Sequence, residues 1–142
     1  MTAIAERIPE TFDFGGTWEE KSGSWWLVPE AAGPRDVARA MLARGARFIT
    51  ITATELPDQG GIRMDYHWDL DGTVLTFTFT IRDKTAESVY TAESIYDLSE
   101  AANLIEREIH EYFAVEFAGR ECEPLFLHAG QTPGVNLREE DE

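Results

Sequence analysis

The sequence predicts an α+β fold, in which an antiparallel or mixed sheet of four or five strands carries two main helices on one face. Two neighbouring segments in the middle of the chain alternate strictly between apolar and polar residues, which is typical of half-buried strands. Apolar residues at helical spacing, both before and after these segments, are typical of amphipathic helices. The length of 142 residues favours a single domain over 1–142.

The first part of the chain is predicted to contain a strand and a helix after an irregular start. Residues 1–23 have no sustained periodicity and several glycine breakers, so we expect an irregular N-terminal segment. Trp25–Val28 is a short apolar run closed by Pro29, which favours a strand. Pro34 then begins the first helix and Gly45 lies just beyond its end, as the usual preferences at helix ends predict.

The middle of the chain predicts a β-hairpin. Residues 62–70 and 75–81 both alternate between apolar and polar side chains, and the Asp71-Gly72 pair between them is a strong signal for a two-residue turn. Such a turn places Tyr66 opposite Phe77. All the apolar residues of the two strands then lie on the same face as Tyr66 and Phe77, as a half-buried sheet requires.

Two further strands and a second helix complete the predicted fold. Residues 47–54 form a strand that precedes the hairpin. Residues 88–96 form a strand that follows it, either at an edge or buried on both faces, because their alternation is weaker. The second helix runs from Ser99 to Tyr112. Asp97 with Glu100 makes a predicted capping box at its start, and Ser99 is the alternative cap.

Composition excludes several classes of function. The 12 basic and 27 acidic residues give a net charge of −15, whereas binding to DNA, RNA or anionic lipid needs a concentrated positive patch. The single cysteine, Cys122, cannot form an internal disulfide, which fits a reducing compartment. The sequence shows no signal-peptide pattern and no apolar stretch long enough to span a membrane. We therefore expect membrane contact only through partner chains, and a solvated acidic tail at 138–142.

The usual signatures of nucleotide, metal and hydrolase sites are missing from the sequence. Asp65, His67 and Asp69 project from one face of the predicted hairpin. They are either the solvated side of an amphipathic strand, which we favour, or the metal ligands or acid–base groups of an independent small enzyme. A second polar group consists of Glu121, Cys122, Glu123 and His128. We favour a space-filling role for the Cys122 thiol over a metal site formed by this group.

The second helix carries a carboxylate in an unexpected position. At about 100° per residue, Glu108 falls inside the apolar sector, between Ala101 and Leu104, while Glu106 lies at the other flank and Arg107 points outward, free to bind a partner. A carboxylate turned toward a core is costly unless it is paired, so an arginine or several backbone N–H groups are its expected partners. We favour a structural clamp for the adjoining loop over an interface or proton-active role.

The chain after this helix is unusually apolar for a loop. Phe113–Gly119 and Leu125–Leu127 have no periodic element of their own, so part of them is expected to fill the core. The rest, including Phe117, is predicted to form an exposed patch for a partner protein. Nine acidic and two basic residues lie between Glu93 and Glu123, which favours docking to a basic partner face.

The stretch Glu106–Gly119 resembles the signature of the thirty-kilodalton subunit of respiratory complex I, the NADH:quinone oxidoreductase. A related domain occurs in energy-converting membrane-bound hydrogenases. The family pattern reads E-R-E, two residues, D, two more, then G-[IV]-x-F-x-G-H. The corresponding positions here are Glu106, Arg107, Glu108, Glu111, Phe113, Val115, Phe117 and Gly119.

Three positions depart from this pattern. Glu111 stands for the usual Asp, Ala114 for the first Gly, and Arg120 for the usual His. The sequence E-I-H-E-Y-F at residues 108–113 is closer to that of the hydrogenase-type relatives. Quinone reduction and hydrogenase-type chemistry therefore both stay open for the parent complex.

The resemblance implies a hydrophilic subunit with no catalytic, metal or cofactor-binding residues of its own, whose motif residues serve structure or the partner interface. It implies that FMN, iron–sulfur clusters, NADH and quinone belong to partner subunits. The expected partners are the large quinone-site or nickel–iron-type subunit and iron–sulfur subunits, in a complex that couples electron transfer to ion translocation. The expected place is the cytoplasmic side, peripheral to the inner face of the cell membrane. A stand-alone protein-binding module is the less favoured alternative.

Overall fold

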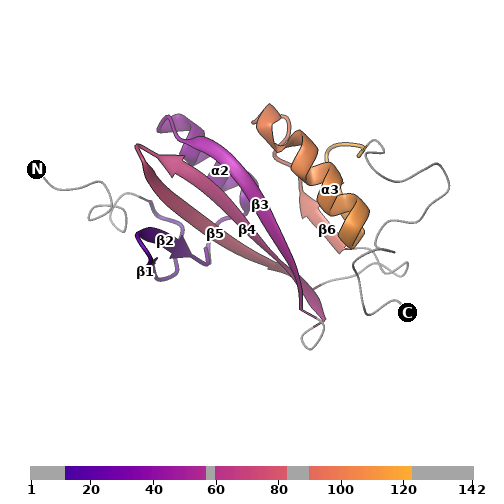
Figure 1. The fold of residues 1–142 in the computed structure, drawn as a ribbon, viewed down its shortest axis with the longest axis horizontal. Coiled ribbons are helices and arrows are strands. Elements are labelled where there is room, and N and C mark those ends of the chain that lie inside the picture. Colours follow the sequence, from indigo (N-terminus) through magenta and orange to yellow (C-terminus); the bar gives the residue numbers. More distant parts are fainter. Residues whose placement is uncertain (1–11, 57–59, 83–89, 123–142) are drawn as a thin grey trace, which may run out of the picture.

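The computed structural model describes residues 12–56, 60–82 and 90–122. Its main element is a five-stranded mixed sheet in the order β1-β2-β5-β4-β3 (Figure 1). The strands of this sheet are β1 (Glu19–Lys21), β2 (Ser24–Leu27), β3 (Arg47–Leu56), β4 (Gly61–Leu70) and β5 (Thr73–Ile81). Within the described residues the helices are α2 (Pro34–Ala43) and α3 (Asn103–Phe113), and a 3₁₀ turn, η1 (Glu100–Ala102), precedes α3. The predicted α+β class is confirmed.

The β4–β5 hairpin has the predicted register. Tyr66 lies opposite Phe77, and the turn residues Asp71 and Gly72 both have positive φ, 50° and 87°. The carboxylate of Asp69 accepts a hydrogen bond from the Gly72 N–H at 2.9 Å, which fixes the turn from within the hairpin. Local turn chemistry and the period-two pattern therefore specify the same register.

The described part of the N-terminal segment, residues 12–23, is more regular than expected. β1 lies within residues 1–23 and pairs antiparallel with β2 around Ser22 and Gly23, whose φ values are 52° and 82°. β2, in turn, pairs parallel with β5, which makes the sheet mixed. The Ser22-Gly23 pair is itself a turn signal, but β1 could not be predicted, because it has only three residues and shows no alternation of apolar and polar side chains.

The two helix starts differ in how well they were predicted. α2 begins at Pro34, and Gly45 beyond its end has a φ of 79°, as expected. The predicted capping box before α3 is wrong, because the Asp97 carboxylate binds Arg35 and η1 has no side-chain cap at Ser99.

The strand predicted over residues 88–96 ends at Glu93 and does not belong to the main sheet. β6 (Tyr90–Glu93) pairs in parallel with β7 (Val115–Ala118) in a separate two-stranded sheet beside α3, and residues 83–89 lie outside the described part. β7 corrects a second expectation, because this stretch was predicted to be an aperiodic loop. Phe117 was predicted to be exposed but is 2% exposed.

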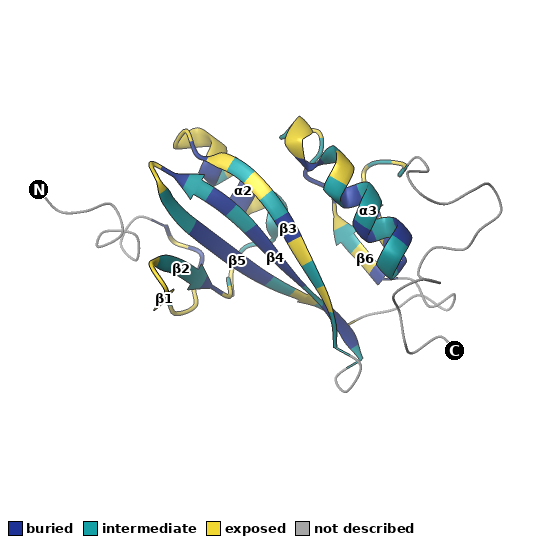
Figure 2. Cartoon of the chain, viewed as in Figure 1, coloured by how far each residue is buried: buried dark blue, intermediate teal, exposed yellow. Residues whose placement is uncertain are grey.

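A single buried cluster joins the apolar face of the sheet to both helices. Trp68 and Phe77 from the sheet, Met41 from α2 and Ile109 from α3 are all nearly inaccessible to solvent. Figure 2 shows this burial as dark blue bands along β4 and β5, with half-buried residues in teal between them. Among the helices in the described residues, none is both long enough and apolar enough to cross a membrane.

Candidate functional site

The buried carboxylate of the motif helix belongs to Glu106 and not to Glu108. Glu106 is 0% exposed, whereas Glu108 is half-buried and Leu104, expected beside it in the apolar sector, is 59% exposed. The spacing within α3 explains the difference, because at about 100° per residue Glu106 lies about 60° from the buried Ile109, whereas Glu108 lies about 100° from it on the other side. The reasoning about the carboxylate was sound, but the predicted residue was wrong.

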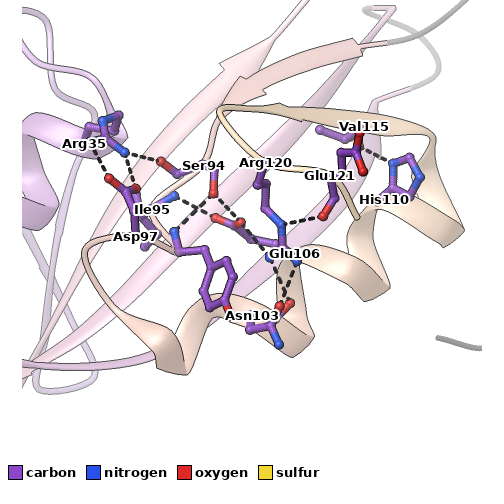
Figure 3. A network of polar contacts seen from close by, with 11 residues as sticks. Arg35, Ser94, Ile95, Asp97, Asn103, Glu106, His110, Val115, Arg120 and Glu121 are labelled. Atoms are coloured by element: carbon purple, nitrogen blue, oxygen red, sulfur yellow. Dashed lines mark hydrogen bonds and ion pairs between the residues drawn. The ribbon is translucent and has the colours of Figure 1, made fainter. Parts of the chain in front are cut away.

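Glu106 is held by three donors from two segments, one after β6 and one after β7 (Figure 3). Its Oε1 accepts hydrogen bonds from Ser94 Oγ at 2.7 Å and from Arg120 Nη1 at 3.3 Å. Its Oε2 accepts a bond from the backbone N–H of Ile95 at 2.8 Å. These are the types of partner that the sequence predicted, an arginine and a backbone N–H. The carboxylate therefore closes a network between the chain after β6, helix α3 and the chain after β7.

Arg120 extends this network to the start of α3. Its Nη2 donates to Asn103 Oδ1 at 2.8 Å, and its guanidinium lies 4.5 Å from the ring centroid of Tyr96. The side chain is only 8% exposed, so its charge is balanced mainly by Glu106. Arg120 occupies the position of the usual motif His, and it uses that position to fasten the end of β7 onto α3.

Helix α2 is tied to the same segment from the other side. Arg35 donates to the Ser94 carbonyl at 2.8 Å and to both carboxylate oxygens of Asp97, at 2.6 and 3.0 Å. The hydrogen bond from Arg35 is the main reason why the pKa of Asp97 is below its ordinary value. The segment between β6 and η1 is therefore held by both helices.

The electrostatics of Glu106 indicate a structural role. Burial raises its pKa above the ordinary carboxyl value, while the bonds from Ile95, Ser94 and Arg120 lower it, and the effect of burial is the larger. A side chain that is 0% exposed cannot touch a substrate unless the network opens. The geometry supports a clamp that fixes α3 and β7.

The remaining motif residues divide between the core and the half-buried surface. Arg107 was expected to be free for a partner, but it already has an interaction within the structure. Gly119 follows β7 with a φ of 95°, a conformation that favours glycine. The buried members are Glu111, Val115 and Phe117, and the half-buried members are Arg107, Glu108 and Phe113.

The strand carboxylates Asp65 and Asp69 serve different parts of the hairpin. Asp65 is buried, not solvated as expected, and accepts bonds from Thr78 Oγ1 and from Arg63 Nε, the latter at 3.1 Å. Asp69 pairs with Arg47 at 3.1 Å and holds the turn. Within the described ranges, no three His, Cys, Asp or Glu side chains are grouped so as to hold a metal ion.

The group around Cys122 is only partly described. Cys122 is half-buried, and burial raises the pKa of its thiol, which fits a space-filling side chain better than a reactive one. Glu121 is exposed. Glu123 and His128 lie outside the described residues, so the choice between filler and ligand stays a prediction for them.

His67 gives a pH-dependent stability that can be measured. Its Nε2 lies 2.9 Å from Thr52 Oγ1 and its Nδ1 lies 2.8 Å from Thr76 Oγ1, and burial lowers its pKa. A lowered imidazole pKa means that the stability from this group is present above about pH 6.5 and is lost as pH falls toward the folded value. We expect His67 to titrate below about 6.5 by NMR. The wild type should also lose more stability than His67→Gln between pH 7.5 and 5.5, and a pKa at or above the ordinary value would contradict this.

Tyr66 offers a stabilising substitution. Its hydroxyl is buried without a hydrogen-bond partner among the described residues, and burial raises its pKa strongly, with Glu106 and Glu93 adding to the effect. Removing an unsatisfied buried hydroxyl should therefore raise the free energy of unfolding of Tyr66→Phe by about 1 kcal/mol. Urea denaturation checks this, with Tyr96→Phe as a matched control at a half-buried position. A loss of stability in Tyr66→Phe would show that the hydroxyl has a partner.

Comparisons with known proteins agree with the motif and the fold. No curated protein sequence matches the chain. Among solved structures, the chain is similar to one in the membrane-bound sulfane sulfur reductase, an archaeal respiratory membrane complex, with 22% sequence identity and a TM-score of 0.72. That match covers 93% of this chain and 79% of the other, and at this identity it shows a shared fold. Residues 30–141 match the family model described as "Respiratory-chain NADH dehydrogenase, 30 Kd subunit". This match spans well over half of the chain, which therefore belongs to the family of the 30 kDa subunit of respiratory-chain NADH dehydrogenase.

Proposed function

We propose that this chain is a peripheral-arm subunit, without a cofactor of its own, of an NADH:quinone oxidoreductase-type membrane redox complex. It packs on the cytoplasmic side against the large subunit that forms the quinone site. FMN, iron–sulfur clusters and the NADH and quinone sites then belong to partner subunits. Family membership supports a partnership with other subunits of a respiratory membrane complex.

The observation that carries this proposal is the enclosure of Glu106. The charged centre of the motif is fully buried and bonded within the chain, so the motif builds a rigid surface and contributes no reactive group. A chain of this kind supports electron transfer, coupled to ion translocation, by holding its partners in place.

A second candidate is the equivalent subunit of an energy-converting membrane-bound hydrogenase. Its support is that the chain departs from the complex I pattern, as at Arg120, which stands for the usual motif His and forms an ion pair with Glu106. The two candidates share the same docking role. They differ only in the large partner, which is a nickel–iron-type subunit in the second case.

The proposed partner surface is the outward side of α3. Leu104 on this side is 59% exposed, and Glu108 is half-buried and makes no hydrogen bond or ion pair with any residue that the structure describes. An exposed leucine beside a carboxylate on a clamped helix suits a partner face with an apolar centre and basic groups around it. The proposed partner surface therefore includes only the outward side of α3 and not all the residues of the motif.

Co-purification tests the proposal. A tagged chain should bring down a large subunit and iron–sulfur subunits from gently solubilised membranes, and mass spectrometry of the large subunit distinguishes the two candidates. Leu104→Glu should reduce this recovery at least tenfold, whereas Leu42→Glu on α2, where the leucine is 37% exposed, should not. Recovery of the wild-type chain alone would overturn the proposal.

A further inference from the structure

The polar face of the main sheet contains a hollow of about 360 Å³ beneath the β1–β2 hairpin. We propose that this hollow is a carboxylate-binding pocket that anchors an acidic segment of a partner chain. The hairpin precedes residue 30, where the match to the family begins, so six of the ten residues that line this pocket lie outside the matched range. In Figure 1 the hairpin lies at the edge of the sheet away from α3. The pocket is thus separate from the motif helix.

Two cations lie on one indole ring in this pocket. Lys21 Nζ is 5.2 Å and the Arg63 guanidinium 6.0 Å from the ring centroid of Trp26. All three residues line the hollow. The contacts with the indole keep both charges beside the hollow, where they are available to a carboxylate. Two basic side chains therefore share one hollow in a chain whose net charge is −15, and each already pairs with one acid, Lys21 with Glu19 and Arg63 with Asp65.

Both cations can bind a further carboxylate. The ion pair of Lys21 with Glu19 is 3.5 Å long and its side chains are 55% and 65% exposed, so a competing carboxylate displaces it at little cost. Arg63 donates to Asp65 through Nε. A guanidinium has five N–H donors in a planar fork, so one bond to Asp65 leaves Arg63 with donors for a second carboxylate.

The walls of the hollow select an acid on a short aliphatic stem. Val28, which is 60% exposed, and Leu56 supply apolar surface, and the exposed Thr80 of β5 supplies a hydroxyl at the rim. A glutamate side chain has this combination of methylene groups and carboxylate. The volume of the hollow suits one or two such side chains.

The position of β1 favours a peptide over a free acid. β1 is the edge strand of the main sheet, so the outer side of Glu19–Lys21 offers backbone groups to an added extended segment. Glu19 and Lys21 are two residues apart and share the face that lines the hollow. A partner segment added to this edge would place alternate side chains on the same face. Backbone pairing and carboxylate binding would then act together.

The test uses the full 142-residue chain, labelled with ¹⁵N, and three probes. These are a capped hexapeptide of alternating Glu and Val, the matched Gln and Val peptide, and free glutarate. We expect the Glu peptide to shift the indole N–H resonance of Trp26 and to bind at least fivefold more tightly than either other probe.

Matched charge variants assign the binding to this pocket. Lys21→Gln should weaken binding of the Glu peptide about fivefold. Arg47→Gln removes the same charge from a side chain that is 81% exposed and outside the hollow, and it should change binding less than twofold. The proposal is overturned if Trp26 does not respond, if the Gln peptide binds equally, or if Lys21→Gln binds like the wild type. Equal binding of glutarate would replace the partner segment with a free small acid.

Discussion

Replacing Glu106 with alanine is expected to lower the free energy of unfolding by about 3–5 kcal/mol, because breaking a buried ion pair leaves its partner charge uncompensated. In this protein, the uncompensated charge is Arg120, whose side chain is 8% exposed. The backbone N–H of Ile95 and the hydroxyl of Ser94 would lose their acceptor at the same time. Urea denaturation followed by circular dichroism measures the change.

Glu108→Ala is the matched control for this experiment. It removes the same charge from the same helix, but from a half-buried position without a described hydrogen bond or ion pair, so we expect a change within about 0.5 kcal/mol. If Glu108→Ala were the more damaging variant, the sequence-based choice of Glu108 would be right and the structural assignment of Glu106 wrong.

A double-mutant cycle separates the ion pair from general packing. Arg120→Ala alone leaves Glu106 buried with the donors Ser94 and Ile95, whereas the double variant removes both charges. We expect the double variant to be less destabilised than the sum of the single variants by about 1–3 kcal/mol. Strict additivity would mean that the 3.3 Å contact contributes little and that Asn103 and Tyr96 hold Arg120 by themselves.

The hairpin could be predicted from sequence because its information is local. Asp71-Gly72 sets the turn, and the alternation beside it decides which side of each strand faces the core. The same reasoning placed Pro34 and Gly45 correctly at the two ends of α2. β7 escaped prediction because four residues of alternation, from Val115, are too few to stand out beside an apolar helix end.

The site was only partly predictable, for a different reason. The sequence indicated a paired carboxylate on the motif helix, but it placed the apolar sector too close to Leu104, which is exposed, and so indicated Glu108 in place of Glu106. The partners of Glu106 lie 11 to 14 residues away, in Ser94, Ile95 and Arg120. Their convergence depends on how β6 and β7 pair, which no local pattern in the sequence indicates.

Phe117→Ala is expected to lower the free energy of unfolding by about 3–5 kcal/mol, as truncation of a large buried aromatic side chain usually does. Phe117 is 2% exposed and belongs to the same buried cluster as Val115 and Ile109. The loss would show that the apolar chain after α3 stabilises the subunit itself, and urea denaturation measures it.

Leu104→Ala separates stability from partner contact. Leu104 is 59% exposed, so its truncation should change stability by less than about 0.5 kcal/mol while lowering recovery of the large subunit. If Phe117 were instead the exposed contact that the sequence suggested, Phe117→Ala would leave the free energy of unfolding unchanged and abolish recovery of the large subunit. The pair of variants therefore decides whether the motif acts on partners directly through its aromatic residue, or indirectly by fixing the helix that carries Leu104.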